Sequence, residues 1–257
     1  MIGADTDLVV LKLGGSVITD KDSPETVDDE NLNQVLDAVS TALKNPETDF
    51  RLILVHGGGS FGHVHAAEHG VSTTTGTSDA AAANAIHGAM KRLNSEVVDR
   101  LQHRDVAALP VHPLSVAARD GEGGLSLPAV ATGRLLDEGF VPVLHGDVIA
   151  HANEGVTVLS GDEIVTSLAD SLGASRIGLC STVPGVLDES NGVIEEIRSF
   201  EDVASVLGES ESTDVSGGMA AKVQELLALG APAHIFGPDS VRAFLNGERA
   251  GTLVDGQ

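Results

Sequence analysis

The sequence predicts an α/β protein with a mainly parallel central sheet covered by helices on both faces. Short apolar runs rich in β-branched residues alternate along the chain with segments of helical periodicity. Glycine-rich turns follow several of these runs, as expected where strands end. With 257 residues, 42% of them apolar, the chain can bury a sizeable core.

The first half of the chain begins with the apolar run Leu8–Leu13, a predicted strand because it ends at a glycine turn. The charged segment Asp20–Asp29 is expected to be a loop. From Asp29, apolar residues recur at helical spacing until Asn45-Pro46, where proline ends the predicted helix. The other elements predicted here are a strand at Arg51–Val55, a Thr/Gly/Ser loop at Ser72–Ser78 and a helix from Asp79 to about His103.

The second half repeats this alternation with shorter runs, interrupted by an acidic excursion at Asp120–Leu127. The predicted strands are Val106–Val111, Val141–Leu144, Arg176–Cys180, a short one within Asn191–Ile197, His234–Phe236 and Gly251–Val254. The predicted helices are Asp162–Leu172, Gly218–Leu229 and one near Ser240–Leu245. No repeat or linker interrupts the chain, so residues 1–257 are expected to form one domain with two lobes, 1–155 and 156–257.

Acidic residues dominate the charge of the chain. Asp and Glu number 38 against 15 Lys and Arg, which gives a formal net charge of −23. Such a surface repels nucleic acid and anionic membranes, so we expect neither as a partner. No apolar run approaches the ~18–20 residues of a membrane helix. The N-terminus lacks a basic signal-peptide region, and the single Cys180 suits a reducing cytoplasm, where we expect the protein to act.

This acidic excess predicts that the protein is halophilic. At 1 M salt, charges are screened within ~3 Å, which suppresses repulsion between the carboxylates. We therefore expect the melting temperature to rise with added KCl and to fall at low salt. Thermal melts across a KCl series measure this, and a melting temperature that did not rise would contradict it.

The first candidate site segment is Lys12-Leu13-Gly14-Gly15-Ser16, with Lys21 nine residues after Lys12. A lysine at a strand end can place its ammonium group on a phosphate oxygen while the N–H groups of the turn hold another. The alternative is an ordinary surface lysine beside a structural turn. Because the chain has only five lysines and two lie here, we favour phosphate binding.

The second segment, His56-Gly57-Gly58-Gly59-Ser60-Phe61-Gly62-His63, follows the apolar run Leu52–Val55. Glycines lack a Cβ, so their backbone can approach an anion closely and direct several N–H groups at it. The alternative is a tight turn with two incidental histidines. We expect His56 only to bind a backbone partner, and His63 to face the anion. His65 and His69 follow, but no third ligand arrives at convincing spacing, so no metal site is predicted.

Two acidic segments follow. In His145-Gly146-Asp147 the carboxylate lies at a strand's carboxyl end, where ligands bind in open α/β sheets, so it can orient a lysine or a substrate hydroxyl. Otherwise it is a turn or capping residue. In Ser160-Gly161-Asp162-Glu163, Asp162 either caps a helix or holds Lys12 through charge-assisted hydrogen bonds, and the sequence leaves both open.

The last segments are Ser216-Gly217-Gly218-Met219, before a helix carrying Lys222, and Cys180 to Leu187, a strand end entering a Pro-Gly turn that can border a nucleotide. Lys222 is expected to face the site rather than solvent. Lysines, backbone donors and a histidine among so many carboxylates predict phosphoryl transfer, which depends on positioning and charge neutralisation. The chain contains neither a G-x-x-x-x-G-K-[ST] nor a G-x-G-x-x-G motif.

The ordered motifs K-L-G-G-S, H-G-G-G-S-F-G-H, H-G-D, L-S-G-D-E and S-G-G-M-x-x-K resemble the amino acid kinase superfamily, and within it the isopentenyl phosphate kinases. The resemblance extends from Leu8 to Lys222 and on to the last strand. The histidine of G-G-G-S-F-G-H is the discriminating feature, because relatives acting on carboxylates lack it. Fosfomycin kinases are similar in this loop and remain an alternative.

The resemblance implies an open αβα sandwich with the phosphate acceptor in the N-terminal lobe and MgATP in the C-terminal lobe. It implies a phosphotransferase of the archaeal-type mevalonate route to isoprenoids, a homodimer in which Mg²⁺ is held mainly through ATP phosphates. The implied catalytic residues are Lys12, Lys21, His63 and Asp162. The acceptor would contact Gly58, Gly62, His63, Gly146 and Asp147. ATP would contact Lys12, Gly14, Gly15, Ser16, Gly59, Ser181, Gly217 and Lys222.

The acceptor tail needs an apolar pocket, for which Ile86 and Met90 on the Asp79–His103 helix are candidates, although either one is also an ordinary core residue. Relatives commonly carry T-D-V-x-G-[VI]-[YF] where this chain has Ser181 to Leu187, without the acid and the aromatic. Because the chain has no Trp or Tyr, no stacking of adenine on an aromatic side chain is expected. A non-catalytic sensor of small anions is the alternative outside enzymes.

Overall fold

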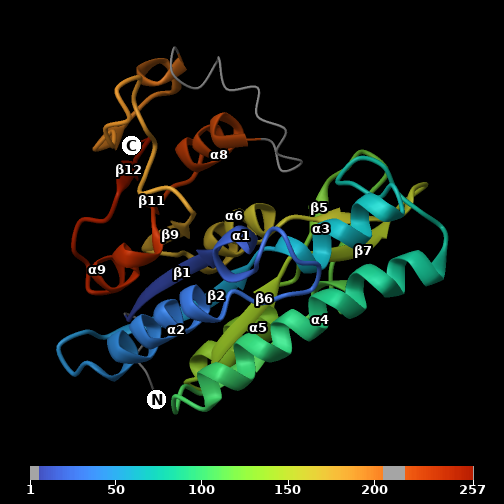
Figure 1. The fold of residues 1–257 in the computed structure, drawn as a ribbon, viewed down its shortest axis with the longest axis horizontal. Coiled ribbons are helices and arrows are strands. Elements are labelled where there is room, and N and C mark those ends of the chain that lie inside the picture. The colour runs from blue at the N-terminus through green and yellow to red at the C-terminus, as the bar shows by residue number, and fades with distance from the viewer. Residues whose placement is uncertain (1–5, 205–217, 257) are drawn as a thin grey trace.

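The centre of the computed structural model, which describes residues 6–204 and 218–256, is an eight-stranded sheet (Figure 1). Its strand order is β10-β12-β11-β9-β1-β2-β6-β3. These strands are β1 (Asp7–Leu13), β2 (Phe50–His56), β3 (Ala108–Pro110), β6 (Val141–His145), β9 (Arg176–Cys180), β10 (Glu196–Ile197), β11 (Ala233–Phe236) and β12 (Thr252–Val254). From β11 to β3 all neighbours are parallel, and β12 is antiparallel to β11. The predicted mainly parallel α/β sheet is confirmed.

Helices cover both faces of this sheet, because successive side chains of a strand point to opposite sides. On β1, Val9, Leu11 and Leu13 pack on one face, and Leu8 and Val10 on the other. The first face is covered by α2 (Asp29–Lys44), α4 (Ala80–Gln102) and α9 (Val241–Leu245). The second is covered by α5 (Val130–Asp137), α6 (Gly161–Leu172) and α8 (Gly218–Leu227). This is the three-layer αβα arrangement that the resemblance implied.

The two long helices begin where the sequence predicts. Asp28 caps α2 by accepting from the Asn31 N–H at 3.0 Å, and Asp79 caps α4 by accepting from the Ala81 N–H at 2.8 Å. Side chains of Asn, Asp and Ser satisfy the first N–H groups of a helix, which otherwise lack partners. Lys44, the last residue of α2, precedes the predicted Asn45-Pro46 stop.

A second sheet of four short strands was not predicted. It has the order β5-β4-β7-β8, with β4 (Ala118–Arg119), β5 (Leu125–Ser126), β7 (Asp147–His151) and β8 (Gly155–Leu159). Figure 1 shows it beside α3 (Gly59–Glu68) and α4, at the end of the molecule away from β12. His145-Gly146-Asp147, expected to be a loop, is instead a one-residue break between β6 and β7. Helices α1 (Gly15–Ile18), α3 and α5 were also missed.

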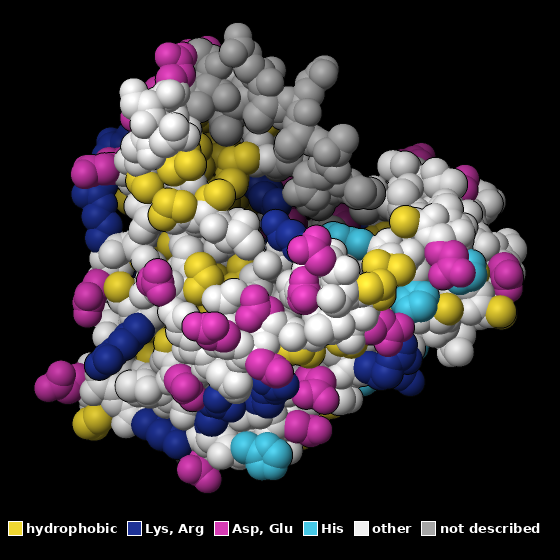
Figure 2. All heavy atoms as spheres, viewed as in Figure 1, with side chains coloured by type: hydrophobic (Ala, Val, Ile, Leu, Met, Phe, Trp, Pro, Cys, Tyr) yellow, Lys and Arg dark blue, Asp and Glu magenta, His cyan; other side chains and the backbone are white. Residues whose placement is uncertain are grey.

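The surface carries acidic side chains over the whole face shown in Figure 2, interspersed with fewer basic ones. The same face is hollowed between the part that bears α8 and the part that bears β7, and Lys or Arg side chains lie along this hollow (Figures 1 and 2). Among the described helices, none has the length and apolar character that crossing a membrane requires.

Candidate active site

The site lies where four neighbouring strands end. The register pairs Leu13 with both His56 and Cys180, and His56 with His145, so the segments that follow these strands start side by side. β1 lies between β2 and β9. The strands of this sheet that follow it in the chain as far as β6 are on the β2 side, and those from β9 onward are on the other side. Such a reversal of strand order places a crevice at the carboxyl ends of the strands, where open α/β sheets bind their ligands.

A cavity of about 720 Å³ occupies this crevice. Thirteen of the predicted site residues line it: Lys12, Gly14, Gly15, Ser16, Lys21, Gly58, Gly62, His63, Gly146, Asp147, Asp162, Ser181 and Lys222. Gly59 is buried and does not line the cavity, and Gly217 lies outside the described residues. Ile86 and Met90 are both almost fully buried and both line the cavity, so they are core residues and wall residues at once.

The two glycine loops touch each other, which explains two of their glycines. A Cβ on Gly15 would lie 2.1 Å from the Gly59 nitrogen, and a Cβ on Gly59 would lie 2.0 Å from Thr19 Oγ1. Gly59 also has φ of +47°, a conformation that favours glycine. The backbones of the two loops are therefore packed against each other without intervening side chains.

Backbone N–H groups at the cavity are available as donors. The N–H groups of Gly15, Ser16, Gly58 and Gly161 line the cavity or its edge and donate to no acceptor in the described part of the chain. By contrast, the neighbouring Gly14 and Gly57 N–H groups are taken by Cys180 and Leu13 carbonyl oxygens. A convergence of free N–H groups is suited to bind an anion such as phosphate.

Lys12 and Asp162 form a nearly buried ion pair in the cavity wall. Lys12 Nζ lies 2.7 Å from Asp162 Oδ1, and the two side chains are 11% and 12% exposed. Lys12 points to the α6 face of the sheet, opposite to Leu11 and Leu13. Of the two roles left open for Asp162, the structure places it on the lysine, because Ser160 is the residue that caps α6. A second lysine, Lys222 on α8, lines the same cavity.

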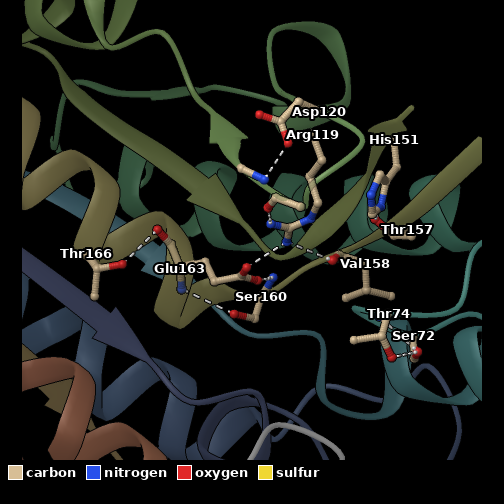
Figure 3. A network of polar contacts seen from close by, with 12 residues as sticks. Ser72, Thr74, Arg119, Asp120, His151, Thr157, Val158, Ser160, Glu163 and Thr166 are labelled. Carbon is tan, nitrogen blue, oxygen red and sulfur yellow. Dashed lines mark hydrogen bonds and ion pairs between the residues drawn. The ribbon is translucent and has the colours of Figure 1, made fainter. Parts of the chain in front are cut away.

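The start of α6, and with it Asp162, is held by a network centred on Glu163 (Figure 3). Glu163 Oε2 accepts from the Ser160 N–H at 2.9 Å, while Ser160 Oγ accepts from the Glu163 N–H at 3.2 Å, which is a capping box. Glu163 Oε1 accepts from Arg119 Nη2 of β4 at 2.6 Å. A second cavity of about 470 Å³, which contains none of the predicted residues, lies against Arg119 and Glu163.

The loop that carries Lys21 is fastened to the helices beside it through Glu25. The Glu25 carboxylate accepts hydrogen bonds from Arg92 at 2.7–3.0 Å and from His65 Nε2 at 2.6 Å. The backbone N–H of Glu25 donates to the Ser60 carbonyl oxygen. The hydrogen bonds from His65 and Arg92 lower the pKa of Glu25. His65 is therefore occupied by Glu25, and the described residues contain no cluster of three potential metal ligands.

The Asp147 carboxylate accepts hydrogen bonds from three donors, none of which is a lysine. Its side chain is 0% exposed and accepts from His87 Nδ1 at 2.9 Å, from the Leu114 N–H at 3.1 Å and from the Val148 N–H at 2.9 Å. The carboxylate thus joins α4, the turn at Leu114 and the start of β7. Its backbone, with Gly146, forms the cavity wall.

Sequence reasoning missed a set of buried histidines behind the glycine loops. His56 and His145 are both 0% exposed, His112 Nδ1 lies 2.9 Å from His145 Nε2, and the rings of His56 and His145 stack 5.7 Å apart. Burial lowers the pKa of His56 to about 3 and that of His145 to about 4. The signal was present in the sequence as two His-Gly dipeptides, each directly after an apolar strand.

These pKa shifts predict acid sensitivity of the fold. Both histidines are neutral in the folded protein, whereas in the unfolded chain they take up protons below the ordinary pKa of 6.5. Their stabilising effect is complete above pH 6.5 and is lost as the pH falls below it. At pH 5 the free energy of unfolding is lower by about 2 kcal/mol for each of the two histidines. Melts in molar KCl between pH 7.5 and 5 measure this, and an unchanged melting temperature over that range would contradict it.

Comparison with known proteins agrees with these features. Residues 7–236 match the model of the amino acid kinase family. The chain is similar to the isopentenyl phosphate kinase of Haloferax volcanii (62% identity over 97% of this chain and 99% of that protein). It is also similar to the isopentenyl phosphate kinase of Methanocaldococcus jannaschii (32% identity over 96% of this chain and 98% of that protein). A solved isopentenyl phosphate kinase superposes with a TM-score of 0.79 at 28% identity, covering 95% of this chain and 98% of the other.

Proposed function

Because the chain belongs to the amino acid kinase family, and within it to the isopentenyl phosphate kinases, we propose that it transfers the terminal phosphoryl group of ATP to isopentenyl phosphate. The products are isopentenyl diphosphate and ADP. One observation carries this proposal: the same 720 Å³ cavity brings Lys12, Lys21, His63 and Lys222 together with the free N–H groups of the glycine loops.

The reaction needs no strong general base. A terminal oxygen of the acceptor phosphate attacks the γ-phosphorus, a new P–O bond forms, and the bond to the β–γ bridging oxygen breaks with its electron pair leaving on ADP. The main obstacle is repulsion between a roughly dianionic acceptor and tetra-anionic ATP, several kcal/mol in a partly desolvated site. Cationic side chains and backbone donors in the cavity lower this barrier by neutralising charge.

Each side of the cavity has a proposed role. Gly58, Gly62, His63, Gly146 and Asp147 line the acceptor side, in the lobe of residues 1–155, and Ile86 with Met90 offers an apolar wall for the five-carbon tail. Gly14, Gly15, Ser16, Ser181 and Lys222 line the ATP side, to which the lobe of residues 156–257 contributes. Lys12, held by Asp162, and Lys21 contact the transferred group. Gly59 acts through loop packing. Gly217 lies outside the described residues and stays a proposed ATP contact.

Mg²⁺ would be held mainly by ATP phosphate oxygens, which are the usual ligands of this ion at nucleotide sites. When bound, it supplies further neutralisation of the β- and γ-phosphates. We further propose a cytoplasmic homodimer with no nucleic-acid or membrane partner. The acidic surface and the fully buried Cys180, whose pKa burial raises to about 12, support a protein adapted to a reducing, salt-rich interior.

The test is ADP release in molar KCl with MgATP across a panel of acceptors: isopentenyl phosphate, fosfomycin, acetylglutamate and other small phosphates. We expect turnover on isopentenyl phosphate to exceed that on every other acceptor. A preference for fosfomycin would place the chain with the phosphonate kinases. Binding of ATP and phosphates without ADP release would make it a sensor.

A further inference from the structure

Two neighbouring strands end in a histidine that makes the same contact with the residue after it. His56 Nδ1 lies 3.1 Å from the Gly57 carbonyl oxygen, and His145 Nδ1 lies 2.8 Å from the Gly146 carbonyl oxygen. The two histidines are opposite each other in the register of β2 and β6, and their rings stack at an interplanar angle of 29°. The contact therefore occurs twice at one edge of the sheet, directly behind the cavity.

The partners of each ring determine which nitrogen carries the hydrogen. A carbonyl oxygen only accepts, so Nδ1 of both rings is the donor. On the other side, Asn94 Nδ2 lies 3.1 Å from His56 Nε2 and is also within 3.4 Å of the Val143 carbonyl oxygen, so the amide nitrogen donates to both. His112 Nδ1 is 2.9 Å from His145 Nε2. Both strand-end histidines are thus neutral, with hydrogen on Nδ1 and a lone pair on Nε2.

This hydrogen bond fixes the direction of a peptide at the cavity. The peptide unit is planar and trans, so its N–H points opposite to its carbonyl oxygen. Because the Gly57 carbonyl faces the His56 ring, the Gly58 N–H points away from that ring. Gly58 lines the cavity, and its N–H donates to no acceptor in the described residues. A rotation of this peptide by half a turn would replace the donor with an oxygen that repels an anion.

We propose that His56 is a positioning residue that locks the Gly57–Gly58 peptide, so that the Gly58 N–H donates to the acceptor phosphate. Asn94 holds the ring in the tautomer that this contact requires, and the stacked His145 packs against the face of the ring. This proposal rests on the proposed function, since it assigns the Gly58 N–H to isopentenyl phosphate rather than to ATP. His56 itself does not line the cavity, so it would act through this peptide and not by direct contact with a substrate.

Two amide substitutions test the lock. In His56→Asn the side-chain NH₂ occupies about the position of Nδ1 and can still donate to the Gly57 carbonyl, whereas in His56→Gln the amide reaches the position of Nε2 and cannot. We expect His56→Gln to raise KM for isopentenyl phosphate about tenfold or more, as loss of one hydrogen bond to a charged group does. KM for ATP should change less than about twofold, and His56→Asn should restore most of the acceptor affinity.

His234→Gln is the matched control. His234 Nδ1 makes the same kind of contact, 3.1 Å to the Ala250 carbonyl, but the residue does not line the cavity. Loss of this hydrogen bond in His234→Gln should lower the melting temperature and leave KM for isopentenyl phosphate and KM for ATP unchanged. Nitrogen NMR of the wild-type imidazole adds a test that does not depend on folding of the variants: His56 should show a protonated Nδ1 and an unprotonated Nε2.

The outcomes separate the two proposals. If the wild type does not turn over isopentenyl phosphate, the proposed function fails. If it does, the lock is overturned by an Nε2–H tautomer, by equal KM values in the Asn and Gln variants, or by an equal rise of KM for ATP.

Discussion

Replacing Lys12 with alanine should lower kcat by about 10³-fold or more. Lys12 lines the cavity, and its ammonium group is held at 2.7 Å by Asp162, so its position is fixed before substrates bind. Removing one preorganised charge-stabilising group typically costs 10²–10³-fold in kcat. Here the loss is expected to be larger, because the Asp162 carboxylate would remain in the cavity wall and repel the phosphates.

The stability of the fold should respond as well. Breaking a buried ion pair by removing one partner costs about 3–5 kcal/mol, because the other charge remains uncompensated. The Lys12→Ala/Asp162→Asn double variant should therefore recover stability but not turnover. Lys44→Ala is the control, since Lys44 pairs with Asp105 at the exposed surface and does not line the cavity. ADP-release kinetics and thermal melts in molar KCl measure both effects; wild-type turnover in Lys12→Ala would exclude Lys12 from catalysis.

His63→Ala should lower turnover on isopentenyl phosphate by about 10²-fold or more. His63 is exposed on the first turns of α3, lines the cavity and follows the free N–H of Gly58 by five residues. From that position we expect its ring to donate to the acceptor phosphate of the proposed reaction, a contact that would strengthen as the phosphate is drawn toward ATP.

The control for His63 is on the same helix. His69, the C-cap of α3, is exposed and does not line the cavity, so His69→Ala should retain wild-type kinetics. Initial rates over a range of isopentenyl phosphate concentrations separate KM from kcat. Full activity of His63→Ala would remove the basis for assigning a phosphate acceptor rather than a carboxylate.

The long elements of this fold could be predicted because each carries its own local signal. Helix α2 has an Asp28 cap, apolar residues at helical spacing and a proline after its end. β1 and β2 are apolar on both faces, as strands covered by helices must be. The strands β4 and β5 are only two residues long, so no periodicity can show in them. β7 and β8 do contain short, mainly apolar runs, at 148–150 and 156–159, and sequence reasoning overlooked both.

Some features of the site could likewise be predicted from the sequence, and others could not. Lys12 lies one residue before the end of β1, and Gly58 two residues after the end of β2. Because parallel strands bring their carboxyl ends together, sequence position alone places both residues in one crevice. The role of Asp147 could not be predicted, because its partner His87 is 60 residues away on α4. The same holds for His145 and His112, which are 33 residues apart. Such contacts follow from the packing of elements that are distant in the sequence and not from any local pattern.

A cavity lined with lysines and free N–H groups recognises oxyanions in general, which bears on how the protein is handled. Sulfate and inorganic phosphate strengthen the burial of apolar surface and are common stabilisers of salt-requiring proteins. Both have the tetrahedral oxygens that the Gly58 loop is suited to hold, so they would act as competitive inhibitors while raising the melting temperature. Stability and turnover are therefore best compared in potassium chloride, whose anion has no oxygen atoms to align with the donors.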